Sequence, residues 1–277
     1  MVKAQIGANI ISNSGNNQFR NPFSTAPVYP WRSLLRCLAS SFVAVLLLIA
    51  EPCAQAWQSA VFQAINFPGC RQGLWNAIAG GSVTGTPLGF GCTDSSGFHG
   101  KGIPSDPYRV MLDGGEESIE FAGLETTTRS DYTVEVWFRI RSAKDGLVTL
   151  MDSRKDRYYA PLRMLIADGK PECVIEMPFP DRVYRAQSST GIEPSKWRQA
   201  VCRFRAESRE LSLFLDGAIE ASTRIPPGTI RSNRIRIGEN FSGDIAEIVF
   251  SAQSEEASAI ETRCREESRR LAGARCR

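Results

Sequence analysis

The segment that decides the fold reads KWRQAVCRF from Lys196, LSLFLDG from Leu211, IRIG from Ile235 and FSGDIAEIVF from Phe241 to Phe250. In its second piece leucine occupies every other position, and Asp216-Gly217 follows directly. Such alternation predicts a β-strand with one buried face, and Asp-Gly after it predicts a tight hairpin. The segment therefore predicts a run of antiparallel strands joined by short turns.

Further strands are predicted before this segment. In the range 133–140 the residues Val134, Val136, Phe138 and Ile140 share one face, while Trp137 lies on the other. We expect Trp137 to be covered by a neighbouring sheet edge or by a C-terminal helix. Strand patterns recur every eight to fifteen residues with turn residues between them, which is typical of an all-β, antiparallel β-sandwich of the jelly-roll type.

Three further stretches of the sequence predict local structure. Asp113-Gly114 lies between two apolar stretches, 108–112 and 118–121, and predicts a hairpin or a bulge. The range 80–106 is crowded with Gly, Ser, Thr and Pro and predicts a surface loop without long regular elements. Asp244 and Glu247 are three positions apart, which predicts opposite faces of a regular strand.

A short C-terminal helix is predicted after Phe250. Ser254 is the expected N-cap, Glu255 and Glu256 are expected in the first turn, and Gly273 is the expected stop. Arginines and glutamates alternate through this stretch, which is typical of a solvated terminal helix.

The chain resembles the concanavalin A-like lectin/glucanase superfamily, in its laminin G-like jelly-roll branch. The resemblance rests on the strand opened by Trp197, on Asp216-Gly217 after an aliphatic strand, and on Gly-Asp-Ile-x-Glu from Gly243 to Glu247, and it covers roughly residues 75–270. It implies a jelly-roll domain of a superfamily that includes both lectins and glucanases. Because calcium occurs in such relatives, Asp113 and Asp244 are weak calcium candidates, but no cofactor is required.

The N-terminal residues predict an export signal. Arg32 and Arg36 precede an apolar run from Cys37 to Ala50, and Ala54-Gln55-Ala56 supplies a small-residue cleavage site. The run is shorter than the roughly 20 residues of a membrane-spanning helix. We expect an extension at 1–30 that also fits a start site assigned too far upstream, a signal peptide at 31–56, and a laminin G-like domain at 57–277.

Cleavage after Ala56 would leave six cysteines in an oxidising compartment, so disulfides are expected. Sequence proximity and strand phase favour the pairs Cys70–Cys92, Cys173–Cys202 and Cys264–Cys276. For the middle pair we expect two neighbouring antiparallel strands; two buried free thiols are the alternative. The cysteine spacing lacks the Cys-x-x-Cys pairs of zinc sites.

The charge pattern argues against nucleic acid as a partner. Residues 1–56 carry 4 − 1 = +3 of the formal net charge of +3, so the remainder is balanced. A balanced domain lacks the basic surface that drives nucleic-acid binding. A glycan or an extracellular or envelope protein is the expected partner, in the medium, the periplasm or at the cell surface.

Catalytic motifs are weak in the sequence. Glucanases resembling this chain carry Glu-x-Asp-x-x-Glu or Glu-x-Asp-x-Glu on one strand, and this spacing does not occur here. The sequence has one histidine, His99, and no Gly-x-Ser-x-Gly motif that would place a nucleophilic serine for it. We expect His99 to be solvated or to form local hydrogen bonds. No catalytic residue is therefore assigned.

A saccharide site is predicted in the stretch after Met151, where aromatic rings and planar polar groups gather. The candidate ligand-binding residues are Asp152, Arg154, Asp156, Tyr158, Tyr159 and Tyr184. A solvated hairpin tip is the alternative interpretation of this stretch. We expect a secreted, non-catalytic binding or adhesion module, with a glycan-cleaving hydrolase or a structural envelope protein held by an uncleaved signal anchor as alternatives.

Overall fold

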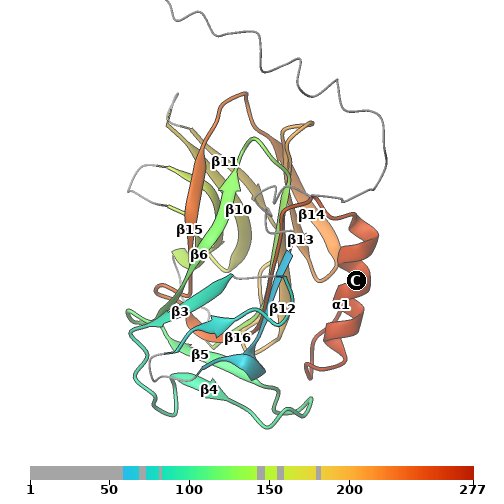
Figure 1. Cartoon of the computed structure of the whole chain (residues 1–277). Helices are drawn as coiled ribbons and strands as arrows, with labels where there is room; N and C mark the ends of the chain where they lie inside the picture. Colours follow the sequence, from blue (N-terminus) through green and yellow to red (C-terminus); the bar gives the residue numbers. More distant parts are fainter. Residues whose placement is uncertain (1–58, 69–72, 81–82, 142–146, 155–158, 179–181) are drawn as a thin grey trace, which may run out of the picture. The chain divides into compact units, whose positions relative to one another are not determined.

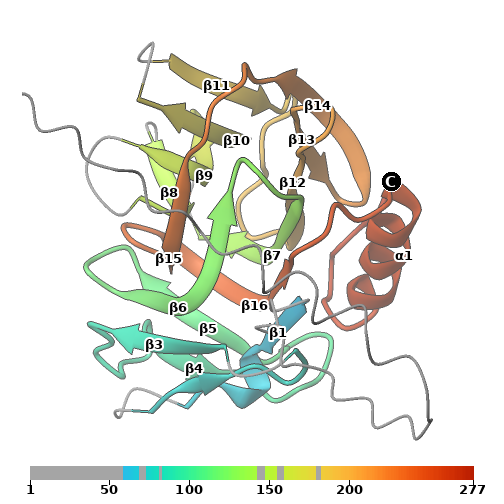
Figure 2. The ribbon, with the colours of Figure 1, turned by 45° about the horizontal axis from the view of Figure 1, so that its top comes forward.

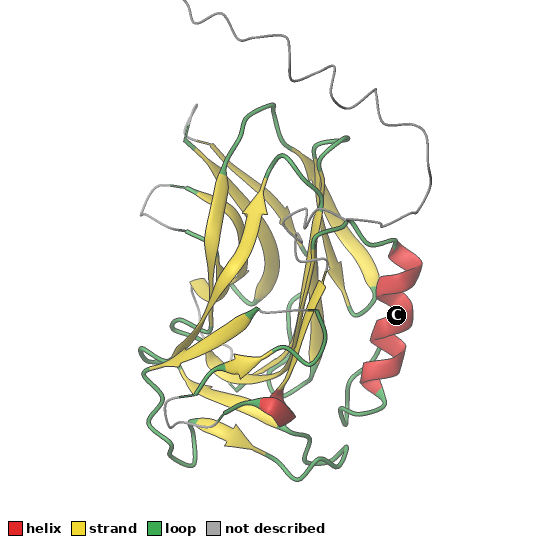
Figure 3. Cartoon of the chain, viewed as in Figure 1, coloured by secondary structure: helices red, strands yellow, loops and turns green. Residues whose placement is uncertain are grey.

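The structure is a computed structural model that describes residues 59–68, 73–80, 83–141, 147–154, 159–178 and 182–277. In this part of the chain two antiparallel sheets pack face to face, and one α-helix follows the last strand (Figures 1 and 3). The predicted all-β sandwich with a short C-terminal helix is confirmed. The predicted extension and signal peptide, 1–30 and 31–56, lie outside the described residues.

Sheet A is built around β16 and β7. Its order is β14 (Ala218–Arg224), β13 (Glu210–Leu215), β12 (Arg198–Arg205), β7 (Tyr132–Ile140), β16 (Ser242–Ser251), β5 (Arg109–Asp113) and β4 (Gly97–His99), and β1 (Ser59–Gln63) also pairs with β16. A 3₁₀ turn, η1 (Ala64–Asn66), follows β1.

Sheet B forms the second layer. Its order is β11 (Arg182–Gln187), β10 (Lys170–Met177), β9 (Ala160–Ala167), β8 (Leu147–Asp152), β15 (Arg231–Ile237), β6 (Ser118–Thr127), β3 (Thr84–Leu88) and β2 (Trp75–Asn76). Neighbouring strands in both sheets are antiparallel, as the turn-rich sequence predicts.

The core lies between the two sheets. Val134, Val136, Phe138 and Ile140 of β7 are buried there together, as their alternation predicts. Each fully buried aliphatic or aromatic side chain of this kind contributes about 1.5–3 kcal/mol of transfer free energy. The alternate side chains of β7 face away from the core. One of them, Trp137, is covered by Cys264 and Leu271 from the C-terminal region.

Two short turns have an Asp-Gly pair at their centre, the predicted one at Asp216-Gly217 and a second one at Asp168-Gly169. Asp216 and Gly217 have φ of 53° and 84°, and Asp168 and Gly169 have φ of 50° and 73°. Positive φ at both central positions is the hairpin conformation that Asp-Gly favours. These turns fix the register of β13 with β14 and of β9 with β10.

Two other expectations are wrong. Asp113-Gly114 does not close a hairpin, because β5 pairs with β16 in sheet A while β6 pairs with β15 in sheet B. The chain therefore crosses from one sheet to the other at Gly114, whose φ is 90°. The range 80–106 is not a plain loop either, because β3 forms there between β6 and β2, and β4 forms there as an edge strand of sheet A.

The disulfide Cys173–Cys202 joins the two sheets. Its Cα atoms are 5.7 Å apart, with Cys173 on β10 of sheet B and Cys202 on β12 of sheet A. The predicted pair is present, but the expected neighbouring strands of one sheet are wrong, because both side chains face the core from opposite layers. The structure also contains Cys264–Cys276, whereas Cys70 of the third predicted pair lies outside the described residues.

The helix α1 (Ala257–Ser268) packs on the outward face of sheet A and lies beside β14 in both views (Figures 1 and 2). Ile260 contacts Val201 and Phe214 there. The expected N-cap is wrong: Glu256 is the cap residue, and Ser254 Oγ instead donates to Asp131 Oδ2 at 2.8 Å. Ser254 is thus used to hold the chain before the helix begins.

Candidate functional site: the outward face of sheet B

A row of charged side chains crosses the outward face of sheet B. The register places Arg185 beside Val174, Val174 beside Arg163, and Arg163 beside Asp152. Asp152 then pairs with Arg236, and Arg236 pairs with Glu120. We call these residues and their ion-pair partners the charged row: Glu120, Asp152, Arg154, Arg163, Glu172, Glu176, Arg185, Arg234, Arg236 and Glu239.

On the strands β8 to β11 the charges of the row are paired across neighbouring strands. Arg185 Nη1 lies 2.6 Å from Glu172 Oε1, and Arg163 Nη1 lies 2.5 Å from Glu176 Oε1. Asp152 Oδ2 forms ion pairs with two arginines, at 2.6 Å from Arg154 Nη2 and 3.2 Å from Arg163 Nε. Each guanidinium is thereby held in a fixed plane.

The second half of the row centres on Glu120 of β6. Arg236 Nη2 lies 3.1 Å from Glu120 Oε2, Arg234 donates to the same oxygen, and Arg236 Nη1 also lies 3.4 Å from Glu239 Oε2. Burial alone would raise the pKa of Glu120, but the hydrogen bonds and charges of Arg234 and Arg236 lower it below its usual value. This carboxylate therefore stays ionised at neutral pH.

The row covers apolar side chains on an outward face. Val174 has no exposed surface, and its register neighbours are Arg163 and Arg185. The ion pairs of these arginines with Glu176 and Glu172 run diagonally past the valine, so their aliphatic stems exclude water from it. This packing makes the row a preorganised surface rather than a set of mobile side chains.

Equal numbers of charges meet in the row. Five arginines (154, 163, 185, 234 and 236) face five carboxylates (120, 152, 172, 176 and 239). Several groups remain open to solvent, with half of the Arg185 side chain exposed. Glu172 Oε2 is buried and accepts no hydrogen bond from the described residues. A buried acceptor without a hydrogen bond lowers the stability of the fold unless a water molecule or a ligand donates to it.

The structure brings together only some of the predicted ligand-binding residues. Asp152 and Arg154 meet in the charged row, and Arg154 N also donates to Asp152 Oδ1 at 2.8 Å. Tyr159 is exposed immediately before β9. Tyr184 lies on the other face of sheet B, because its register partner Ile175 is a core residue and Tyr184 packs against the same core. Asp156 and Tyr158 lie outside the described residues.

Most of the row was missed from the sequence. Arg163, Glu172 and Glu176 are charged positions inside otherwise apolar strands, and this interruption is a signal that could have identified them. Arg236 and Glu120 lie far apart in the sequence and meet only because β15 pairs with β6. Their proximity could be predicted only from the order of the strands in the sheet.

The weak calcium candidates do not form a calcium site. Asp244 Oδ2 accepts from Arg139 Nη2 at 2.6 Å, and Asp244 Oδ1 lies 3.4 Å from Arg141 and 3.9 Å from Arg109. Three guanidinium groups already neutralise this carboxylate and would repel a divalent cation. Asp113 Oδ1 accepts from Gly115 N at 2.8 Å, which is a turn interaction. The described donor set therefore does not fit Ca²⁺.

Asp244 and Glu247 share one face of β16, contrary to expectation. Asp244 pairs with Arg139 and Glu247 pairs with Trp137, and a bulge between them inserts one extra residue. Glu247 consequently lines a pocket of about 190 Å³ on the outward face of sheet A, together with Glu267 and Arg270. Burial and the charge of Glu267 raise the pKa of Glu247 to about 7.

His99 makes local contacts, as expected. Its Nε2 lies 3.2 Å from the carbonyl oxygen of Thr93 and 3.3 Å from that of Ser96. Among the residues that the structure describes, no group of three or more His, Cys, Asp or Glu side chains could hold a metal ion. In the same residues no helix is long and apolar enough to cross a membrane.

The family model for the concanavalin A-like lectin/glucanases superfamily matches residues 113–253. The chain belongs to this superfamily. No curated protein matches it in sequence.

Solved structures share the fold at low sequence identity. The binding domain of botulinum neurotoxin serotype D has a TM-score of 0.55 at 12% identity, over 76% of this chain and 52% of that one. Domain 4 of AbnA, a GH43 extracellular arabinanase from Geobacillus stearothermophilus in complex with arabinotriose, has a TM-score of 0.55 at 15% identity, over 74% and 98%.

A Trypanosoma rangeli sialidase in complex with the inhibitor DANA has a TM-score of 0.54 at 11% identity, over 74% of this chain and 32% of that one. The chain spans about half the length of the neurotoxin binding domains that it matches. At these identities the similarity concerns the fold.

Proposed function

We propose that the protein is a secreted, non-catalytic binding module that recognises a neutral carbohydrate on the outward face of sheet B. The observation that carries this proposal is the charged row. Guanidinium and carboxylate groups held in fixed planes are suited to the paired hydroxyl groups of a sugar ring, and they lose little side-chain entropy on binding. The balance of charge favours a neutral ligand over an acidic or basic one.

The surroundings of the row supply the other elements of a saccharide site. Tyr159 is exposed immediately before β9, five residues after Arg154 in the sequence, and is the aromatic side chain that we assign to the apolar side of a sugar ring. Glu172 Oε2 is a buried acceptor without a hydrogen-bond partner among the described residues, beside the half-exposed Arg185, and we assign it to a hydroxyl group of the ligand. The structural relative from the arabinanase, which was solved with arabinotriose, supports carbohydrate as the ligand class.

The row is poorly suited to hydrolysis. A glycosidase needs one carboxyl group with a raised pKa beside a second carboxylate at about 5–10 Å. Here Arg163 lies between Asp152 and Glu176 and forms an ion pair with each of them. Both carboxylates are thus already engaged by the same guanidinium.

A binding screen tests the proposal. The oxidised protein is applied to an array of neutral and charged oligosaccharides and extracellular matrix proteins, beside Arg154→Ala, Arg185→Ala and the control Arg265→Ala. The control removes an exposed arginine that is paired with Glu261 on α1, far from the row. We expect saturable binding to a neutral oligosaccharide that both row variants weaken at least about tenfold and the control leaves unchanged. Binding only to proteins, or equal binding by all variants, contradicts the proposal.

One observation favours a hydrolase as a second candidate. Glu247 has a pKa of about 7 and shares its pocket with the carboxylate of Glu267, which is the combination of a general acid and a second carboxylate. Release of reducing sugar by the wild type, lost in Glu247→Gln but kept in Arg185→Ala, would identify this activity. Absence of release from every oligosaccharide bound on the array rejects it.

A further inference from the structure

We infer that the C-terminal tail forms a second ligand site, a pocket for a small ligand that carries a carboxylate or sulfate group. The pocket has a volume of about 360 Å³ and is lined by residues of the tail, of the segment that leads into β12 and of the turn after β13. Its charged lining residues are Glu193, Lys196, Arg198, Asp216, Arg275 and Arg277. This volume is within the range of small-molecule sites.

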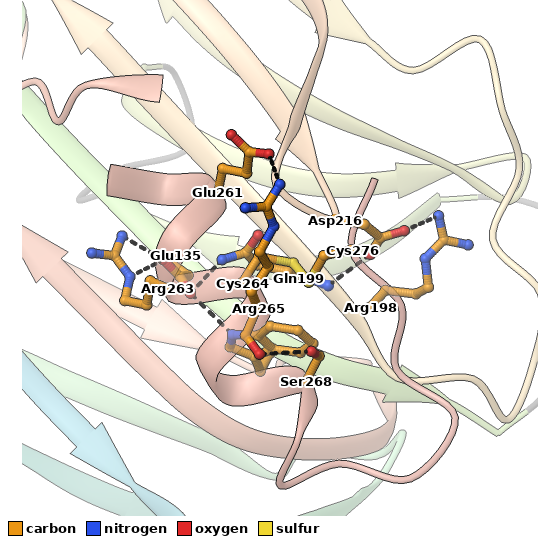
Figure 4. The surroundings of a disulfide bond; sticks show 11 residues. Glu135, Arg198, Gln199, Asp216, Glu261, Arg263, Cys264, Arg265, Ser268 and Cys276 are labelled. Carbon is orange, nitrogen blue, oxygen red and sulfur yellow. Dashed lines mark hydrogen bonds and ion pairs between the residues drawn. A yellow bond between two sulfur atoms is a disulfide. The ribbon is translucent and has the colours of Figure 1, made fainter. Parts of the chain in front are cut away.

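The tail is held in place by several contacts. Cys276 is bonded to Cys264 of α1, and Leu271 is buried against Trp137 and Trp197. Ala272 N donates to Pro104 O at 2.8 Å, and Arg277 N donates to Asp216 O at 2.9 Å. The tail after α1 therefore folds back on the sheet, where the disulfide ties Cys276 to α1 (Figure 4). Gly273, Arg275, Cys276 and Arg277 of the tail line the pocket.

The other wall comes from the start of β12 and the turn after β13. Arg198 Nη2 lies 2.6 Å from Asp216 Oδ2, and Gln199 N donates to Asp216 Oδ1 at 3.1 Å. Figure 4 shows this pair beside the disulfide. Because Asp216 is neutralised by Arg198, it does not repel an anion, and the rigid pair fixes the shape of the wall.

Two cations of the pocket remain available. Arg277 forms an ion pair with Glu220, and Arg198 forms one with Asp216. Within the part of the chain that the structure describes, Lys196 and Arg275 form no ion pair, and their one nearby counter-charge in the lining is Glu193. The side chains of the pocket thus offer 2 − 1 = +1 of unpaired charge, with Lys196 and Arg275 on opposite walls.

This pocket takes a different ligand class from the charged row. The row has equal numbers of positive and negative groups, whereas the side chains of the pocket carry a surplus of positive charge and include a planar guanidinium suited to an oxyanion. A carboxylate and a sulfate ester share this chemistry. The inference stands whether or not the row binds a neutral sugar, because the two sites have no residue in common.

The test titrates glucuronic acid, glucose 6-sulfate and glucose into the oxidised protein by calorimetry. The variants are Lys196→Ala/Arg275→Ala, which removes the two unpaired cations, and the control Arg269→Ala, which removes an exposed arginine at the end of α1 that lines the other pocket. Neither change removes a described ion pair, so both variants are expected to fold. Circular dichroism checks this directly.

We expect saturable binding of glucuronic acid, of glucose 6-sulfate or of both, and none of glucose. The double variant should lose at least about tenfold in affinity, while Arg269→Ala should stay within about twofold. Preference between the two anions identifies the carboxylate or the sulfate as the natural group. Equal binding of glucose, equal affinity of the double variant, or no binding of either anion at millimolar concentration overturns the inference.

A further variant tests the role of the tail. Cys276→Ser releases the end of the tail without altering any cation, while Cys173–Cys202 and the core still hold the sandwich. We expect this variant to unfold cooperatively at a lower temperature and to keep its sheet B ligand, but to lose affinity for the anion. Unchanged anion affinity in the folded variant contradicts a site that the tail builds.

Discussion

Arg263 of α1 donates from Nε to Oε2 of Glu135 at 2.6 Å, and this ion pair connects the C-terminal helix to the central strand of sheet A. Glu135 has no exposed surface, and its Oε1 accepts from Trp137 Nε1 and Gln199 Nε2. Burial raises the pKa of Glu135 against the charge of Arg263. Burial would lower the pKa of Arg263, but Glu135 and Glu255 raise it.

Breaking this pair should destabilise the domain strongly. Arg263→Ala leaves a buried carboxylate without its counter-charge, and we expect a loss of about 3 kcal/mol in the free energy of unfolding. Arg265→Ala, which removes the exposed pair with Glu261, should cost less than about 1 kcal/mol. Urea unfolding followed by tryptophan fluorescence measures both. Adding Glu135→Gln to Arg263→Ala should recover part of the loss; no difference between the two arginine variants would contradict this role.

The disulfide between the sheets should matter more than the disulfide of the tail. Replacing Cys173 and Cys202 by alanine removes a link across 29 residues of chain, and we expect a loss of about 3 kcal/mol. The disulfide Cys264–Cys276 spans only 12 residues, so its removal should lower the free energy of unfolding by less than the removal of Cys173–Cys202 does. Thermal unfolding of the two double variants ranks them. The reverse order would mean that the tail, rather than the sheet-to-sheet link, limits unfolding.

Glu247 should make stability depend on pH. Its pKa in the folded protein is about 7, above the ordinary 4.5, so the folded state binds more protons than the unfolded state between these values. Stability should therefore fall as the pH rises from about 4.5 to 7, by on the order of 3 kcal/mol. The difference in unfolding free energy between wild type and Glu247→Gln, measured across this window, isolates the contribution. A difference that is constant with pH would refute it, and Glu261→Gln is the exposed control.

Calcium should have no effect through Asp244. Because three guanidinium groups surround this carboxylate, millimolar calcium or a chelator should change the melting temperature by less than about 1 °C. Asp244→Asn, in contrast, leaves Arg109, Arg139 and Arg141 without their shared counter-charge and should cost about 2 kcal/mol. A clear rise of the melting temperature with calcium that Asp244→Asn abolishes would restore the metal site.

Patterns among neighbouring residues were sufficient to predict the main strands and several turns. The alternation in β7 and β13 and the Asp-Gly pairs at 216 and 168 depend on neighbouring residues, and the structure agrees with them. Predictions were wrong where the structure depends on residues that are distant in the sequence. Asp113-Gly114 has the same local chemistry as a hairpin, but the sheet to which each flanking strand belongs is decided by β16 and β15.

The candidate site was only partly predictable for the same reason. Asp152 and Arg154 are close in the sequence, and the structure brings them together. The placement of Tyr184 depended on its phase in β11, which is set by pairing with Ile175 across the connection from β10. The bulge in β16 likewise moved Glu247 onto the face of Asp244, and a regular strand period does not contain this information.

The central claim is that the charged row binds a neutral saccharide, and NMR of the arginine Nε–Hε groups tests it most directly. Signals of Arg154, Arg163, Arg185 and Arg236 are assigned from single variants and followed during titration with the neutral oligosaccharide selected on the array. The account predicts saturable shifts of these four signals with one common affinity, while Arg263 and Arg265 stay unchanged. Shifts confined to arginines outside the row, with the row signals unmoved at saturation, would contradict it.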